Sequence, residues 1–185
     1  GFVTVEGRKM SKSLGNVLLV RDLLDDAPGE AIRFALLGAH YRHPLDWSAK
    51  GLAQAKRGLD RLYGVLDDLS DVPDVPLAAD LLNTFEAALE DDLNFPGAIA
   101  ELFQLAKAAR QAETAEDRAL CKTALREAGA LLGLLQQNPA DWFGRPAEDD
   151  SDTATIQRLV EERFAARSAR DFATARRRGS AERST

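Results

Sequence analysis

The chain of 185 residues carries 24 Lys and Arg against 30 Asp and Glu, a formal net charge of −6, and 45% of its residues are hydrophobic. This balance is typical of a soluble domain and argues against a protein that coats nucleic acid over its whole surface, so any RNA binding would use a local basic patch. No apolar run approaches the roughly 20 residues that span a bilayer, and the single cysteine, Cys121, excludes an internal disulfide framework, so a cytoplasmic setting without a membrane partner is expected.

The first residues predict a short strand followed by a loop. The stretch "FVTV", residues 2–5, alternates apolar and β-branched residues, and Glu6-Gly7 is a turn signal. The run "GRKMSKSLGN", residues 7–16, has neither helical nor strand periodicity and predicts a loop. We expect Gly15 to turn this loop in the left-handed conformation that glycine adopts without strain.

Helical patterns dominate the rest of the chain. A short helix is expected to begin at Val20 or Arg21. Pro28 suits the first turn of the next helix, which should end near His40 or Tyr41.

The clearest periodicity follows "HPLDWS", whose Ser48 suits a helix cap. Further helices are expected at about residues 77–90, 96–111, 116–136 and 153–173, joined by short connections. The sequence therefore predicts a mainly α fold, in which a short strand and a loop precede an antiparallel helical bundle. Apolar residues after Ser48 recur at steps of three and four and form a seam that this bundle should close within one chain: Leu52, Ala55, Leu59, Leu62, Leu66 and Leu69.

Two lysines give the loop its chemistry. Lys9 and Lys12 lie three residues apart, with Ser11 between them and Ser13 after them. Ammonium groups on flexible stems bind phosphate as point charges, and hydroxyl and amide groups add donors. The residues alone leave two interpretations open: a loop that closes over a triphosphate and stabilises the charge that develops as pyrophosphate leaves, or a solvated loop without a ligand.

The loop also carries a family signature. The string "KMSKS" is the nucleotide-loop motif of class I aminoacyl-tRNA synthetases. Three later stretches, "AIRFALLGAHYRHPLDWS", "LEDDLNFPGAIAELF" and "LLGLLQQNPADWF", resemble the second half of cysteinyl-tRNA synthetases in the same order. This resemblance implies a ligase that uses ATP, with Mg²⁺, to form cysteinyl-adenylate and then transfers cysteine to tRNA(Cys).

The resemblance also assigns roles to residues in the loop. It implies that Lys12, the second lysine of the motif, is a catalytic contact to ATP and that Lys9 supports it. Met10, Ser11 and Ser13 complete the expected nucleotide-binding set.

The resemblance implies four regions in a chain that we expect to be monomeric. Residues 1–47 would hold the nucleotide loop and a stem-contact region, and residues 48–145 a helical tRNA-binding bundle. Residues 146–174 would form a linker and a C-terminal helix. The stretch "RRRGSAERST" then departs from the family pattern, so residues 175–185 are expected to form a disordered basic tail.

Several parts of the family pattern have no counterpart in this sequence. Its adenine, cysteine and zinc motifs belong upstream of the loop, so we expect a fragment that is inactive alone and binds no zinc, although zinc is expected in the full-length family protein. His40 and His43 share the spacing of the adenine motif but are expected to have structural or surface roles. Asp91 and Asp92 are expected to serve turn and capping chemistry.

Two other functions remain open at this stage. The mycothiol-pathway ligase that joins cysteine to an amino sugar shares the signature loop and resembles the same family. A helical module that only binds RNA is the non-enzymatic alternative.

Overall fold

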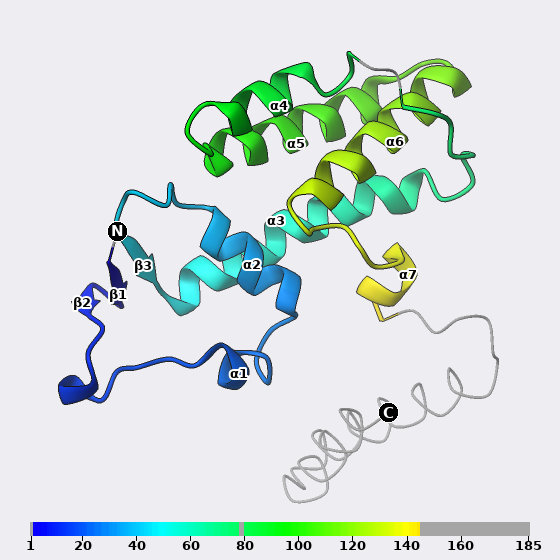
Figure 1. Cartoon of the computed structure of the whole chain (residues 1–185). Helices are drawn as coiled ribbons and strands as arrows, with labels where there is room; N and C mark the ends of the chain where they lie inside the picture. The colour runs from blue at the N-terminus through cyan, green and yellow to red at the C-terminus, as the bar shows by residue number, and fades with distance from the viewer. Residues whose placement is uncertain (1, 78–79, 145–185) are drawn as a thin grey trace, which may run out of the picture. The chain divides into compact units, whose positions relative to one another are not determined.

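The computed structural model describes residues 2–77 and 80–144 (Figure 1). Residues 1–139 form one compact unit. The mainly α fold is confirmed, whereas the helix expected at residues 153–173 and the tail at 175–185 lie outside the described residues. The elements, in chain order, are β1 (Val3–Val5), β2 (Arg8–Lys9), the 3-10 helix η1 (Lys12–Leu14), α1 (Val20–Leu23), α2 (Gly29–Leu37), β3 (Leu45–Trp47), α3 (Ala49–Asp68), α4 (Asn83–Glu90), α5 (Phe95–Gln111), α6 (Ala115–Leu131) and α7 (Pro139–Trp142).

A three-stranded sheet with the order β2-β1-β3 begins the fold. The strand expected at residues 2–5 is present as β1, and a turn at Glu6 and Gly7, with φ of 49° and 74°, leads into the antiparallel β2. On its other side β1 pairs in parallel with β3, which the sequence did not predict. Asp46 in β3 accepts hydrogen bonds from the Thr4 hydroxyl at 2.6 Å and the Gly7 amide at 2.8 Å, and these bonds lower the pKa of its carboxyl group.

The helix that follows Pro28 is shorter than predicted. It ends at Leu37 and is followed by Gly38, because residues 38–43 leave the helical path and close a turn in which the His43 amide donates to the His40 carbonyl at 2.8 Å. The short helix that was expected to begin at Val20 or Arg21 is α1. The expected cap at Ser48 is also confirmed, since its hydroxyl accepts from the Gly51 amide at 3.1 Å.

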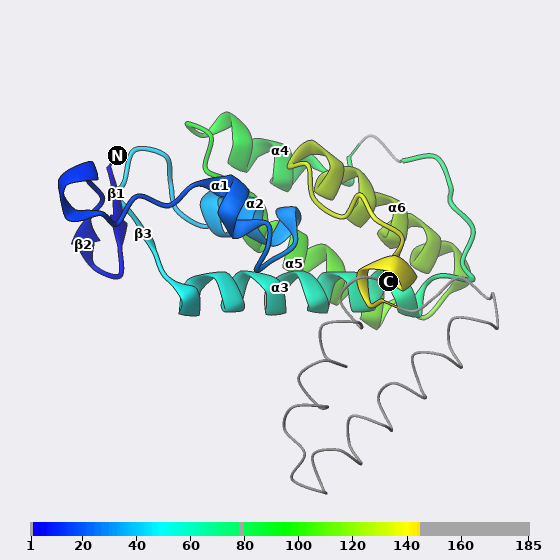
Figure 2. The same ribbon diagram turned by 90° about the horizontal axis from the view of Figure 1, so that it is seen from below.

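The apolar seam of α3 is closed within this chain. Its members from Ala55 to Leu69 are buried, and only Leu52, near the start of the helix, is half-buried. Helices α2 and α5 both pack against α3, which runs along one edge of this unit in Figure 2. Burial of these side chains removes apolar surface from water and is the main stabilising contribution to the fold.

Beyond α3, helix α5 packs against both α4 and α6 and runs antiparallel to each of them (Figure 1). The predicted start of α4 at residue 77 is wrong, since the helix begins at Asn83 after an irregular segment that contains two prolines. The predicted end of α6 at residue 136 is also wrong. Gly133 adopts a left-handed φ of 64°, and the Leu134 amide turns back to the Gly129 carbonyl at 2.8 Å, a common way for a helix to end.

No helix in residues 2–77 or 80–144 combines the length and the apolar character needed to cross a membrane.

Candidate functional site

The lysine loop is more ordered than its sequence predicted. We use this name for residues 9–16, which begin in β2 and continue through η1. Lys9 lies in β2 opposite Thr4, and Lys12 is the first residue of η1. Both lysine side chains are exposed, whereas Met10 and Ser11 between them are half-buried. The structure therefore fixes the backbone between the lysines and leaves their ammonium groups toward solvent.

Asn16 closes the base of the lysine loop. Its Oδ1 atom accepts from the Ser11 amide at 2.9 Å, and its Nδ2 atom donates to the Lys9 carbonyl at 3.1 Å. Sequence reasoning missed this role, although an asparagine directly after a turn glycine is a residue type that often bonds to nearby backbone. The side chain of Asn16 thus holds the two halves of the loop together.

The serines and Gly15 shape the tip of the loop. Ser11 Oγ accepts from the Leu14 amide at 3.3 Å and lies 3.2 Å from Ser13 Oγ, so the two hydroxyls sit side by side. Gly15 has the expected left-handed φ of 64°, and its amide donates to the Lys12 carbonyl at 3.2 Å. Two ammonium groups and two hydroxyls are therefore carried by one short turn, a donor set that suits an anion.

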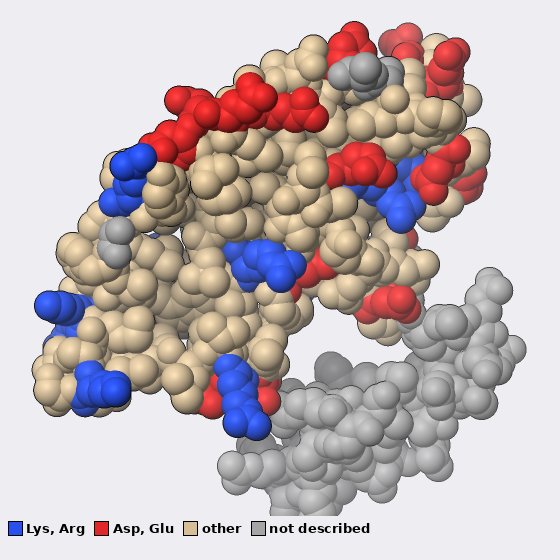
Figure 3. Space-filling view, viewed as in Figure 1, with Lys and Arg blue, Asp and Glu red and all other residues tan. Residues whose placement is uncertain are grey.

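Charge is distributed unevenly around the molecule. Basic side chains lie over the part that carries β2 and η1, where Arg8, Lys9 and Lys12 are exposed (Figure 3). Acidic side chains follow α4 along the opposite border of the same view, where Glu86 and Glu90 are exposed. A polyanion such as a triphosphate is therefore favoured at the lysine loop and disfavoured along α4.

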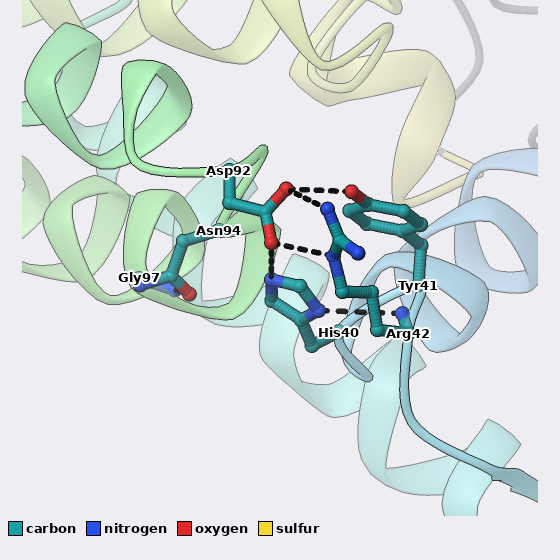
Figure 4. A network of polar contacts seen from close by, with 6 residues as sticks. All are labelled: His40, Tyr41, Arg42, Asp92, Asn94 and Gly97. Carbon is teal, nitrogen blue, oxygen red and sulfur yellow. Dashed lines mark hydrogen bonds and ion pairs between the residues drawn. The ribbon is translucent and has the colours of Figure 1, made fainter. Parts of the chain in front are cut away.

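A polar network joins two distant segments of the chain (Figure 4). Asp92, after α4, accepts from the Tyr41 hydroxyl at 2.6 Å and from Arg42 Nε and Nη2 at 2.6 and 2.8 Å. His40 Nε2 lies 3.9 Å from the same carboxylate. We call these four residues the Asp92 network.

The contacts of the Asp92 network explain the ionisation of its members. Hydrogen bonds from Arg42 and then Tyr41 lower the pKa of Asp92 to about 2. The hydrogen bond to Asp92 raises the pKa of Tyr41. The network joins the segment after α2 to the segment after α4, and the Asp92 carboxylate is paired with the Arg42 guanidinium.

Asp92 does more than the predicted turn and capping chemistry, because it binds Arg42 and Tyr41. The cap of α5 is provided instead by Asn94, whose side chain accepts from the Gly97 amide at 3.0 Å. His40, for which a structural or surface role is expected, lies next to Asp92, and its ring stacks on that of Tyr41 with 4.9 Å between the ring centres.

Other candidate sites in the described residues are less suited to chemistry. No group of three or more His, Cys, Asp and Glu residues there could hold a metal ion. Cys121 is half-buried, and burial raises the pKa of its thiol. A hollow of about 450 Å³ opens between α2, β3, α3 and α5, with Phe34, Trp47 and Phe103 in its lining, but no residue of the lysine loop contributes to it.

Two stretches of the chain match known protein families. Residues 1–57 match the family described as the tRNA synthetases class I (C) catalytic domain, and residues 84–136 match the DALR domain. The cysteine–tRNA ligase of Parvibaculum lavamentivorans is 55% identical over 96% of this chain, and that of Xanthomonas campestris pv. campestris is 54% identical over 95% of it. The chain belongs to the cysteine–tRNA ligase family.

The match covers only part of each relative. The chain spans 38% of the length of the Parvibaculum ligase and 38% of that of Rhodospirillum rubrum, to which it is 51% identical. In this chain, the lysine loop falls in the part matched to the catalytic domain, whereas Asp92 falls in the part matched to the DALR domain. The Asp92 network therefore connects the two matched regions.

Proposed function

We propose that this chain is the part of an ATP-dependent cysteine–tRNA ligase that contacts the phosphates of ATP and binds tRNA(Cys). One observation carries the proposal: Lys9 and Lys12 are exposed on a turn that Asn16 and Gly15 hold in shape, within the region matched to a class I catalytic domain. Family membership supports the choice of tRNA and cysteine as substrates.

The chemistry requires charge stabilisation at the leaving group. The cysteine carboxylate attacks the α-phosphorus of ATP, the bond to the β-phosphate oxygen breaks, and pyrophosphate leaves with the bonding electron pair. Lys12 would contact the departing phosphates, and Lys9 would support the loop. Met10, Ser11 and Ser13 would complete the nucleotide-binding set. Because the negative charge on pyrophosphate develops during this step, a lysine contact there stabilises the transition state more than the ground state.

The division of labour along the chain is part of the same proposal. Residues 1–47 would serve the nucleotide and the tRNA stem, and residues 48–145 would supply helices that bind tRNA. The similarity of residues 84–136 to a DALR domain supports the second assignment. ATP would enter as its Mg²⁺ complex.

Lys12→Ala in the ligase that contains this segment tests the catalytic role. We expect kcat for cysteine-dependent ATP–pyrophosphate exchange to fall by about 10²–10³, the loss typical of removing one transition-state contact, with a smaller change in KM for cysteine. Lys107→Ala, which removes an exposed lysine from α5, is the matched control and should leave kcat unchanged. Equal rates for Lys12→Ala and the parent would contradict the assignment.

Phosphate binding by the 185-residue chain can be measured separately. Inorganic tripolyphosphate should shift the amide resonances of residues 9–16 in a titration followed by NMR, and Lys12→Ala should weaken that response. Binding of tRNA should weaken steeply as salt rises, since each released counterion contributes to the affinity. A tripolyphosphate titration that leaves residues 9–16 unchanged would remove the support for a nucleotide loop.

A further inference from the structure

The segment that carries the lysine loop is weakly packed. We call residues 10–28, which connect β2 to α2, the loop arm. Every residue of the arm is half-buried or exposed. A segment with so few buried contacts keeps its position mainly through its two ends. The sheet holds one end of the arm through β2. The position of the lysine loop therefore also depends on how the other end, at the start of α2, is attached.

Glu30, in the first turn of α2, adds buried hydrogen bonds to that attachment. Its side chain is buried, with 8% of the residue exposed. Its Oε2 atom accepts from the Tyr63 hydroxyl of α3 at 2.8 Å and from the Leu135 amide at 3.0 Å. Its Oε1 atom accepts from the Gln136 amide at 3.1 Å. One carboxylate therefore joins α2 to α3 and to the segment that follows α6.

The segment after α6 is shaped to receive a carboxylate. Leu135 has a left-handed φ of 59°, a strained value for leucine, and this conformation brings two consecutive amides toward Glu30. Successive amides that converge in this way form an anion-binding concavity. Arg33, one turn further along α2, donates to the Gly133 carbonyl in the same segment.

Tyr63 completes the arrangement from α3. Its hydroxyl donates to Glu30 and accepts from the Gln137 amide at 3.1 Å. Burial raises the pKa of Tyr63, which keeps the hydroxyl protonated as a donor. A buried carboxylate with three donors is well satisfied, so removing its charge or a donor leaves polar groups unpaired.

We propose that Glu30 is a positioning residue that anchors the loop arm to the helical part of the molecule and so sets the place of the lysine loop relative to α3 and α6. The inference rests on the proposed function only in taking the lysine loop as the ATP-contacting element. The competing explanation is that Glu30 contributes stability alone and that the arm keeps its place without it.

Distances between spin labels separate these explanations. Labels are attached at Leu19→Cys, exposed in the arm, and Ala53→Cys, exposed on α3, in a Cys121→Ser background, and measured by double electron–electron resonance. The labelled parent should give one narrow distance distribution. Glu30→Gln keeps the side-chain size but points an NH₂ group at a backbone or hydroxyl donor, so the narrow distribution should be lost.

Two further variants keep the test decisive. Tyr63→Phe removes a donor to Glu30 while leaving the carboxylate in place, and it should also broaden the distance distribution. This variant replaces Glu30→Gln in the test if Glu30→Gln does not fold. Leu102→Ala removes a fully buried side chain from α5 and leaves the three donors to Glu30 in place, so it should lower Tm while the distribution stays narrow.

The outcomes divide cleanly. A folded Glu30→Gln chain whose distribution superimposes on that of the parent would overturn the anchor, as would a parent distribution that is already broad. Broadening in Leu102→Ala equal to that in Glu30→Gln would assign the effect to stability alone. The distances need no nucleotide, so normal pyrophosphate exchange by Lys12→Ala would overturn the proposed function and leave the anchor standing.

Discussion

At Asp92, one carboxylate accepts hydrogen bonds from side chains that lie 50 and 51 residues earlier in the sequence. The donors are consecutive residues, Arg42 and Tyr41, and the Arg42 guanidinium also lies 5.2 Å from the centre of the Tyr41 ring. Nothing in the local pattern of "DDLNFP" identifies which of its two aspartates has this role. The spacing suggests a turn, and only the folded chain brings Arg42 to Asp92.

The first prediction concerns the two tyrosines of the chain. The hydrogen bond to Asp92 raises the pKa of Tyr41, and burial raises that of Tyr63, so neither should ionise at the ordinary value of about 10. A raised pKa means that the protonated hydroxyl stabilises the fold below pH 10 and that this contribution is lost as each tyrosine ionises. Absorbance of the phenolate in a pH titration measures both transitions.

Asp92→Asn is the informative variant in this titration. It should bring the Tyr41 transition down toward about 10 and leave that of Tyr63 in place, because only Tyr41 bonds to Asp92. Asp91→Asn, at the exposed neighbouring position, should change neither transition. A Tyr41 that ionises normally in the parent chain would show that this hydrogen bond does not form in solution.

The second prediction concerns acid stability. The pKa of Asp92 is about 2 in the folded chain against an ordinary value of 3.8. Its ionised form therefore stabilises the fold above pH 3.8, and this stabilisation is lost as the pH falls through about 2. The urea midpoint of the parent should therefore exceed that of Asp92→Asn near neutral pH, and this gap between the two midpoints should narrow as the pH falls from 3.8 to about 2. Because 45% of the Asp92 side chain is exposed, added salt should also narrow it. A gap that is constant with pH would contradict the ion pair.

Three of the helices begin directly after a residue whose side chain caps them. Ser48, Asn94 and Thr114 each accept a hydrogen bond from an amide in the first turn of α3, α5 and α6, respectively. The starts of α3 and α5 were predictable to within a residue because cap residues and prolines leave a direct signal in the sequence. The ends of α2 and α6 were less predictable, since the residues after each helix remain compatible with helical periodicity.

The third prediction tests the cap at Ser48. Ser48→Ala removes the acceptor for the Gly51 amide and should lower the free energy of unfolding by about 1 kcal/mol in urea denaturation. Ser48→Asn retains a side-chain acceptor and should restore most of the loss. If Ser48→Ala and Ser48→Asn are equally destabilised, the effect comes from packing around β3 rather than from the cap.

Long-range pairings set the limit on what could be predicted for the whole molecule. Apolar spacing correctly predicted a helical bundle that closes the seam of α3, and the "KMSKS" string identified the lysine loop. Neither the parallel pairing of β1 with β3 nor the contact of Glu30 with Leu135 has a local signature. Both depend on groups that approach only after the chain has folded, and the bond to Leu135 uses a backbone amide, which every residue except proline carries.

The fourth prediction tests the packing behind Glu30. A Cβ atom added at Gly129 in α6 would lie 2.8 Å from Leu135 Cδ1, so Gly129→Ala should be destabilising because the overpacking cost of about 1–3 kcal/mol exceeds the helix-propensity gain. Gly64→Ala in α3 is the matched control, since its Cβ would meet no atom within 4 Å. That variant should gain up to about 1 kcal/mol. Urea denaturation of both variants should give changes of opposite sign, and stabilisation by both would contradict the tight contact.

The parallel pairing of β1 with β3 has a consequence for the order of folding. Thr4 and Asp46 meet at a sequence separation of 42 residues, whereas helix hydrogen bonds and caps join residues three or four apart. Closing a long segment costs more chain entropy than forming a helical turn, so non-local contacts generally form more slowly. We therefore expect the helices to form first during refolding, and the three-stranded sheet that contains Lys9 to form later.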